Sequence, residues 1–221
     1  MRRVDEPERF ANPSGPERRF FDLWSVFYDF PLVQRLTYRP IHDAVLHVLR
    51  RSSPRRVLDV GCGTGLLAAR IRRELDGAHV VGCDFSGGML RHAAAREPGN
   101  SWVQGDALHL PFRAASFEAI LSTESFHWFP DPDAALGEFF RVLAPRGRVL
   151  IALVNPPLEI LSRAARLASQ LAGEPFEWPT RERMRERVEA AGFRVEAQRR
   201  ILRIPLGVLL PPVLTVCVRP E

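Results

Sequence analysis

The middle of the chain alternates between short apolar runs and longer stretches in which apolar residues recur every three or four positions. Short apolar runs are typical of buried strands, and the three-to-four spacing is typical of amphipathic helices. The runs predict five strands, at Arg56–Val60, His79–Cys83, Ser101–Gln104, Phe117–Ser122 and Gly147–Val154. The intervening stretches predict helices at Gly65–Asp76, Ser86–Glu97 and Asp131–Leu143. This alternation indicates an α/β fold in which a parallel sheet is doubly wound with helices on both faces.

The pattern changes beyond residue 154. A helical insertion is expected at about 157–180, followed by a charged amphipathic helix at Thr180–Ala191 with Thr180 as its N-cap. Two late apolar runs, Phe193–Ile204 and Val213–Val218, predict an antiparallel hairpin at one edge of the sheet. Upstream of the first strand, the sequence predicts a flexible arm at residues 1–17. It predicts an N-terminal helical cap at residues 18–54. Residues 55–221 then form the core.

Composition narrows the classes of function. The chain has 221 residues, which suits one α/β domain, and its mean hydropathy of -0.11 is that of an ordinary globular protein. All 31 basic residues are arginine, which excludes a Schiff-base lysine and a P-loop lysine. The net charge is +5, but 26 carboxylates are interspersed with the arginines, and this mixing argues against nucleic acid as a partner.

Targeting and redox signals are those of a cytoplasmic protein. Cys62, Cys83 and Cys217 are too few and too scattered for a disulfide framework or a zinc site, so no metal is expected. The N-terminal stretch lacks the apolar segment of a signal peptide. No apolar run reaches the roughly 18 residues of a membrane span. The sequence leaves the oligomeric state open.

A glycine-rich segment carries most of the information about function. Gly61, Gly63 and Gly65 follow a predicted strand and open a predicted helix. Glycine lets the backbone turn tightly there and lets a ligand approach the peptide groups. The dinucleotide fingerprint G-x-G-x-x-G requires its third glycine at the position of Leu66, so the spacing argues against NAD. A tight turn without a ligand is the alternative.

Two carboxylates follow the next two predicted strands. Asp84 can accept hydrogen bonds from a ribose diol. Capping of the next helix is the alternative role, although Ser86 is better placed for it. Asp106 follows the third strand and can accept a hydrogen bond from the exocyclic amine of adenine. The glycine segment and both acids lie on successive strand ends, at the crevice where doubly wound sheets bind ligands.

Five segments carry a family resemblance: VLDVGCGTG (57–65), CDFSGGML (83–90), GDALHLPF (105–112), FEAILSTESFHWFPD (117–131) and LAPRGRVLIA (143–152). Together they resemble the class I S-adenosylmethionine-dependent methyltransferases, in particular the small-molecule branch that includes the ubiquinone/menaquinone methyltransferases. The resemblance covers about residues 55–155. It implies a Rossmann-like fold whose seven-stranded, mostly parallel sheet ends in a C-terminal antiparallel hairpin. It also implies S-adenosylmethionine as cofactor and S-adenosylhomocysteine as product.

The resemblance also assigns a cofactor-binding set. Its members are Asp59, Gly61, Cys62, Gly63, Gly65, Asp84, Phe85, Met89, Gly105, Asp106, Ala107 and Thr123. Asp59 and the glycines would hold the methionine moiety, and Asp84 the ribose hydroxyls. Phe85 and Met89 would flank the adenine, and Asp106 would meet its amine.

Methyl transfer is a displacement at a sulfonium carbon, so the protein mainly positions the reactants and excludes water. A base is needed only where the acceptor holds a proton that it does not lose alone. His127, four residues after Thr123, is the candidate catalytic base. A hydrogen bond to backbone is its alternative role. Glu124 and Tyr28 are lesser candidates for the base.

Aromatic side chains supply a candidate substrate wall. The predicted substrate residues are Trp24, Tyr28, Arg39, Glu124 and Trp128. The alternative for the aromatics is core packing, because an apolar helix stripe usually faces inward. Arg39 can pair with a carboxylate of the cofactor or substrate, or form only a surface salt bridge. A pocket lined by the aromatics would take an apolar or aromatic molecule.

The expected function is therefore S-adenosylmethionine-dependent methyl transfer to a small, lipophilic or aromatic molecule, with oxygen favoured over carbon and nitrogen as the acceptor. Two alternatives stay open. One is a phospholipid or quinone methyltransferase that works in transient contact with a membrane surface. The other is a regulator that binds the cofactor without turnover.

Overall fold

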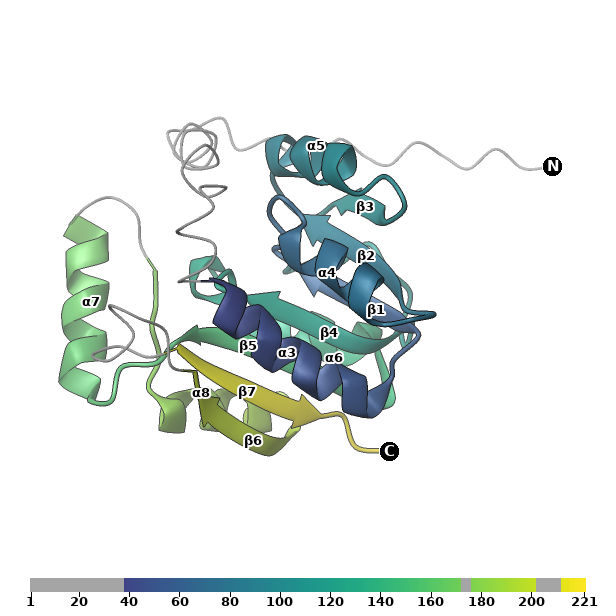
Figure 1. The fold of residues 1–221 in the computed structure, drawn as a ribbon. Coiled ribbons are helices and arrows are strands. Elements are labelled where there is room, and N and C mark those ends of the chain that lie inside the picture. The colour runs from purple at the N-terminus through teal and green to yellow at the C-terminus, as the bar shows by residue number, and fades with distance from the viewer. Residues whose placement is uncertain (1–37, 172–175, 202–211) are drawn as a thin grey trace.

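The computed structural model describes residues 38–171, 176–201 and 212–221, and it holds one seven-stranded sheet in the order β3-β2-β1-β4-β5-β7-β6 (Figure 1). The strands are β1 (Arg56–Val60), β2 (His79–Asp84), β3 (Ser101–Gln104), β4 (Phe117–Thr123), β5 (Leu143–Val154), β6 (Arg194–Arg200) and β7 (Pro212–Val218). Neighbours from β3 to β5 pair in parallel, whereas β7 is antiparallel to both β5 and β6. The doubly wound sheet and its C-terminal antiparallel hairpin are confirmed.

Helices cover both faces of this sheet (Figure 1). They are α3 (Arg39–Ser52), α4 (Leu66–Glu74), α5 (Gly87–Arg96), α6 (Pro132–Val142), α7 (Glu159–Leu171) and α8 (Arg181–Ala190), with a short 3-10 helix, η2, at Phe126–Trp128. Helices α3 and α4 pack on one face, and α6 and α8 on the other. In contrast, α7 stands beyond the end of β5, to one side of the sheet.

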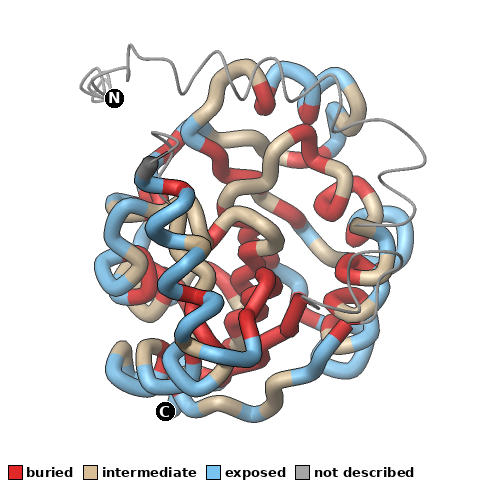
Figure 2. The backbone as a smooth tube through the Cα atoms, turned by 90° about the vertical axis from the view of Figure 1, so that its left-hand side faces the viewer, coloured by how far each residue is buried: buried red, intermediate tan, exposed pale blue. Residues whose placement is uncertain are grey.

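The central strands are largely apolar because each face meets a helical layer. Successive side chains on a strand point to opposite faces. In β4, Ala119 and Leu121 join the cluster under α3 and α4, and Ile120 between them joins the cluster under α6. In β5, Leu150 faces α3 and Ile151 faces α6 in the same way. The buried backbone therefore runs through the middle of the molecule (Figure 2).

Local signals set the starts of three helices. The Ser86 hydroxyl accepts a hydrogen bond from the amide of Met89 at 3.3 Å and caps α5. Asp131 accepts from the first amides of α6, at 3.1 and 3.0 Å. Thr180 caps α8 through the amide of Arg183 at 3.3 Å. A capping side chain needs only its own helix start, so the sequence identifies Ser86 and Thr180 correctly as caps and places the start of α6 at Asp131.

Two strands differ from their predicted limits by more than one residue. β5 begins at Leu143, because Leu143 pairs with Phe117 before a bulge lets β4 and β5 continue in register from Ala119. Arg146, at φ 62, lies within the added part of β5. β6 ends at Arg200, and the rest of the predicted strand to residue 204 falls largely outside the described residues.

The helix α3 packs directly on the sheet. Its residues Ile41, Val45, Leu46 and Leu49 are fully buried and share one cluster with β1, β4, β5 and β7. The proposed arm and the first part of the proposed cap lie outside the described residues. The division into arm, cap and core stays a prediction.

Truncation of Phe139 tests the core under α6. This ring is fully buried, with its centroid 6.4 Å from those of Phe126 and Phe129. We expect Phe139→Ala to lower the free energy of unfolding by about 3–5 kcal/mol in urea titration, because the substitution leaves a cavity. The control Leu167→Ala, at an exposed position, should change it by less than about 0.5 kcal/mol. Equal effects would contradict this core assignment.

Candidate functional site

The turn between β1 and α4 is built from left-handed glycines. Gly61, Gly63 and Gly65 have φ of 70°, 53° and 75°, a region that side chains rarely adopt. The amides of Gly61 and Cys62 donate to the carbonyl of Cys83 at 2.8 and 3.2 Å. The turn is thereby held against the end of β2.

The three glycines differ in what surrounds them. A Cβ on Gly61 would overlap the side chain of Ser125, and one on Gly65 would overlap the indole of Trp102. A Cβ on Gly63 would meet nothing within 4 Å. Close packing therefore also requires glycine at positions 61 and 65. The space beside Gly63 is open to a ligand.

Asp59, at the carboxyl end of β1, is a buried carboxylate without a hydrogen-bond partner on either oxygen in the described structure. Burial, and then the nearby charge of Asp84, raise the pKa of Asp59 to about 7. Buried polar atoms are normally hydrogen-bonded, so an orphaned carboxylate calls for a donor from outside the chain. Its place beside the glycine turn fits a cationic ligand group.

Asp84, at the end of β2, ties the strand ends together. Its Oδ2 accepts from the amide of Gly63, and its Oδ1 from the amide of Ser86, both at 2.8 Å. Burial raises the pKa of Asp84, and these two hydrogen bonds oppose the rise. Each oxygen keeps a further lone pair for a ligand hydroxyl. Because Ser86 caps α5, the Asp84 carboxylate is not needed as the cap and can bind the glycine turn and a ligand hydroxyl.

The end of β3 completes this edge. The amide of Gly105 donates to the carbonyl of Asp84 at 3.1 Å. Asp106 is exposed and accepts from the amide of Leu108 at 2.9 Å. Phe85 is 47% exposed, while Met89 and Ala107 are buried beside the same strand ends. The predicted nucleotide-binding residues therefore come together along β1, β2 and β3.

The end of β4 is fastened to the glycine turn. The Ser125 hydroxyl donates to the carbonyl of Val60 at 3.1 Å and lies 2.8 Å from the hydroxyl of Ser122. Thr123, half-buried, ends β4, and Glu124 follows it in the left-handed region at φ 55. Strained backbone of this kind clusters at functional sites. The sequence analysis did not single out Ser122 or Ser125. Their only distinguishing feature in the sequence is that they are small polar residues on either side of the end of β4.

His127 lies among aromatic rings next to this edge. Its ring centroid is 5.1, 6.1 and 6.3 Å from those of Trp128, Phe176 and Trp178. The His127 carbonyl accepts from the amide of Glu177 at 3.1 Å. The Nδ1 atom is shut off from solvent without a hydrogen-bond partner in the described structure, and burial lowers the pKa of His127 to about 4. The imidazole is therefore neutral at physiological pH.

The remaining predicted residues are placed as follows. Trp24 and Tyr28 lie outside the described residues. Arg39 is exposed in the first turn of α3, and no hydrogen bond or ion pair among the described residues connects it to the strand ends. Burial raises the pKa of the Cys62 thiol, which keeps it protonated. The sequence analysis did not single out Phe176. No local pattern indicates its contact with His127, which lies 49 positions earlier in the chain.

A doubly wound sheet with a glycine turn and three acids on adjacent strand ends defines a nucleotide-cofactor-binding α/β protein. Residues 58–151 match the family model described as a methyltransferase domain. The demethylmenaquinone methyltransferase of Deinococcus radiodurans is 34% identical over 64% of this chain and 69% of its own length. That of Thermus thermophilus is 42% identical, but the match covers 48% of this chain and half of that enzyme.

A solved structure supports the same family assignment. A Haloferax volcanii methyltransferase, solved in complex with the Trm112 activator, superposes with a TM-score of 0.71 at 26% identity, over 91% of this chain and 98% of its own. The chain belongs to the class I S-adenosylmethionine-dependent methyltransferases. Its cofactor is S-adenosylmethionine, and the orphaned Asp59 and the open face of Gly63 fit that group.

Within the described ranges, no helix is both long and apolar enough to cross a membrane. No group of three or more His, Cys, Asp or Glu residues in the described part of the chain is arranged to hold a metal ion.

The raised pKa of Asp59 predicts a pH-dependent stability. The unfolded chain gives up this proton near pH 4, whereas the folded protein keeps it up to about pH 7. The contribution of Asp59 is thus most favourable below about pH 4 and is lost as the pH rises to 7. We expect Asp59→Asn to raise the free energy of unfolding at pH 8, by on the order of 4 kcal/mol, and to change it little at pH 4. A gain that does not depend on pH in urea titrations would contradict the assignment.

Removal of the Asp84 carboxylate tests the ribose assignment. We expect Asp84→Ala to weaken binding of S-adenosylhomocysteine by about 1–3 kcal/mol in calorimetry, because charged hydrogen bonds are lost. The matched control is Asp76→Ala, at an exposed position just beyond α4. It should leave the affinity unchanged. Unchanged affinity in Asp84→Ala would refute the assignment.

Proposed function

We propose that the protein transfers a methyl group from S-adenosylmethionine to a hydroxyl oxygen of a small, lipophilic or aromatic molecule. The observation that carries this proposal is the aromatic cluster around His127 beside the cofactor edge. Its rings lie close together, with centroids of Phe176 4.7 Å from Trp178 and 5.4 Å from Trp128. Such a wall favours an apolar or aromatic acceptor.

The names of two relatives support a lipophilic acceptor, but not oxygen as the accepting atom. The relatives of Thermus and Deinococcus are named for demethylmenaquinone, a quinone. The chain matches only part of each, so the acceptor of this protein is inferred from its own cluster and not transferred from theirs.

The residues present would divide the work of the reaction. The bound cofactor supplies a methyl carbon on a positively charged sulfur, which makes it electrophilic without help from the protein. The glycine turn, Asp59 and Asp84 would hold the cofactor, with Thr123 close to its sulfur end. The aromatic cluster would orient the acceptor and exclude water. His127, whose imidazole is neutral because burial lowers its pKa to about 4, would take the proton of the acceptor hydroxyl.

The proposal is tested in two stages on the full chain. Calorimetric titration with S-adenosylhomocysteine, with NADH as the control ligand, should show micromolar binding of the first and none of the second. Phenols and quinols, with matched anilines and thiols, are then supplied with S-adenosylmethionine, and methylated product is measured. Product from the hydroxyl compounds is expected. Cofactor binding without product from any acceptor would instead support a regulator without turnover.

Substitution of His127 tests its role as a base. We expect His127→Ala to slow turnover by roughly 100-fold or more, with unchanged affinity for S-adenosylhomocysteine. Because the pKa of His127 is about 4, the wild-type rate should show no histidine step between pH 6 and pH 8 and should fall only toward pH 4. The control His47→Ala, at an exposed position on α3, should have the wild-type rate. A loss of only a few-fold in His127→Ala would leave the residue a structural role.

A further inference from the structure

The helix α7 turns its apolar side chains toward solvent. Five large hydrophobic side chains are exposed in the described part of the chain, and four belong to α7 or the turn before it. These are Leu158, Ile160, Leu161 and Leu167, with exposed fractions of 59, 71, 43 and 59%. Exposed apolar residues gathered in this way mark an interaction surface.

The exposed residues form a continuous stripe. Ile160, Ala164 and Leu167 follow the spacing of one helix face, and Leu161 and Ala168 flank them. All five are exposed. A surface helix of a globular protein normally buries this face. The pattern of α7 is therefore inverted relative to the other helices.

Polar contacts fix this inverted orientation. The Ser162 hydroxyl donates to the carbonyl of Trp178 at 2.6 Å. The Ser169 hydroxyl accepts from the amide of Phe176 at 3.2 Å. Both serines are buried, so rotation of the apolar stripe toward the protein would break these bonds in a dry environment.

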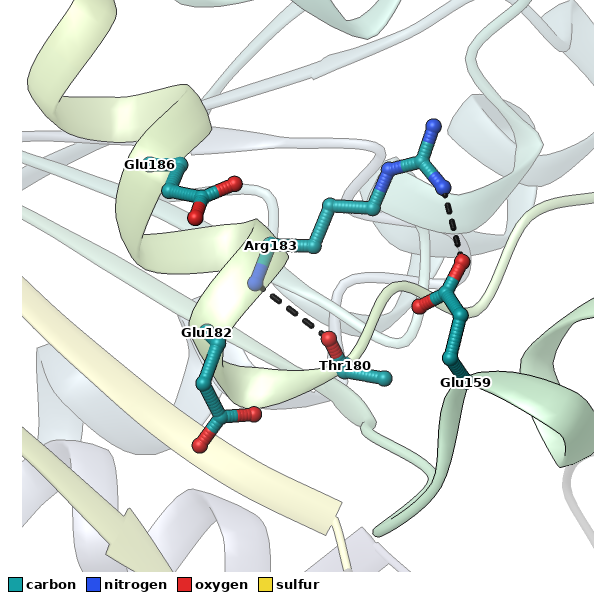
Figure 3. A pocket seen from close by; sticks show the side chains of 5 residues that line it. All are labelled: Glu159, Thr180, Glu182, Arg183 and Glu186. Carbon is teal, nitrogen blue, oxygen red and sulfur yellow. Dashed lines mark hydrogen bonds and ion pairs between the residues drawn. The ribbon is translucent and has the colours of Figure 1, made fainter.

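The start of α7 is fastened to α8 as well. Glu159 accepts a hydrogen bond from the Arg183 guanidinium at 3.0 Å, across a shallow polar pocket that Thr180, Glu182 and Glu186 also line (Figure 3). This pocket is charged and open, and it offers no cover for the stripe.

We propose that α7 docks on the surface of an anionic membrane, with its apolar stripe in the headgroup region. The charge of the helix agrees with this partner. Arg163 is exposed one turn from both Ile160 and Leu167 and pairs with Glu159 at 3.6 Å, Arg166 is exposed on the adjoining side of the helix, and the whole chain carries a net charge of +5. An apolar face with basic residues on one side is compatible with helices that lie in the membrane interface and are attracted to anionic lipids.

A second copy of the chain fits this stripe less well. A helix of 13 residues is about 20 Å long. One stripe on it offers a few hundred Å² at most, whereas a stable dimer buries about 800 Å² on each partner. A lipid surface has no such minimum area, because apolar burial and charge attraction add for each side chain that enters it.

The docking surface is continuous with the candidate acceptor site. The segment at 176–178 bonds to the inner side of α7 and also packs its rings against His127. Docking through α7 would thus bring a lipophilic acceptor, dissolved in the membrane, close to the proposed base. Delivery of an acceptor to His127 rests on the proposed function, whereas the docking of α7 on a membrane does not.

Vesicle flotation of the full chain tests the proposal. The probes are vesicles of equal parts phosphatidylglycerol and phosphatidylcholine, and vesicles of phosphatidylcholine alone. We expect low-salt binding to the anionic vesicles, with several-fold weaker binding to the neutral ones. The double variant Ile160→Ser/Leu167→Ser should lower the partition coefficient at least ten-fold. The variant Arg163→Gln/Arg166→Gln should lower mainly the preference for anionic lipid.

The matched control is Arg51→Gln/Arg55→Gln, which removes two exposed charges distant from α7 in the sequence and should bind vesicles within two-fold of wild type. Three results would overturn the proposal. They are wild-type protein that does not float with anionic vesicles, a serine variant that binds like wild type, and a wild-type dimer that the serine variant dissociates. Binding of S-adenosylhomocysteine is measured on the same samples. It shows that each variant is folded, and it tests the methyltransferase function separately from docking.

Discussion

The tight turn after β1 is the constraint on which the rest of the site depends. Gly61 and Gly65 leave room for Ser125 and Trp102, which come from the ends of β4 and from β3. Any side chain at either glycine would push one of these neighbours away and move a strand end that carries a candidate ligand contact. The turn therefore sets the spacing of β1, β2, β3 and β4 at the edge where the cofactor is expected.

The stability of the core allows unfavourable groups to persist at this edge. Asp59 is a buried carboxylate whose oxygens have no partner in the described structure, and Asp84 lies close enough to raise its pKa. Glu124 adopts a left-handed backbone at the end of β4. Each feature costs free energy in the protein alone. Their gathering at one end of a fully packed sheet is typical of a site whose interactions are completed by a ligand.

The segment at 176–178 connects two features that lie far apart in the sequence. Its rings pack against His127, and its backbone accepts and donates the hydrogen bonds that orient α7. The candidate acceptor site and the exposed apolar stripe are consequently two sides of one unit.

The sequence by itself determined the order of strands and helices, the N-caps and the placement of Asp59, Asp84 and Asp106 at strand ends. These follow from hydrophobic periodicity and from residues next to one another in the chain, so a pattern can encode them. Only the tertiary structure decided that Ser125 meets Gly61, and that Phe176 meets His127. It also decided that the apolar stripe of α7 faces outward: the sequence predicted a helical insertion at about 157–180, and α7 covers Glu159–Leu171, but the pattern did not specify the surroundings of its apolar face. The physical reason is that contacts between distant segments depend on how the layers pack, which no local pattern specifies.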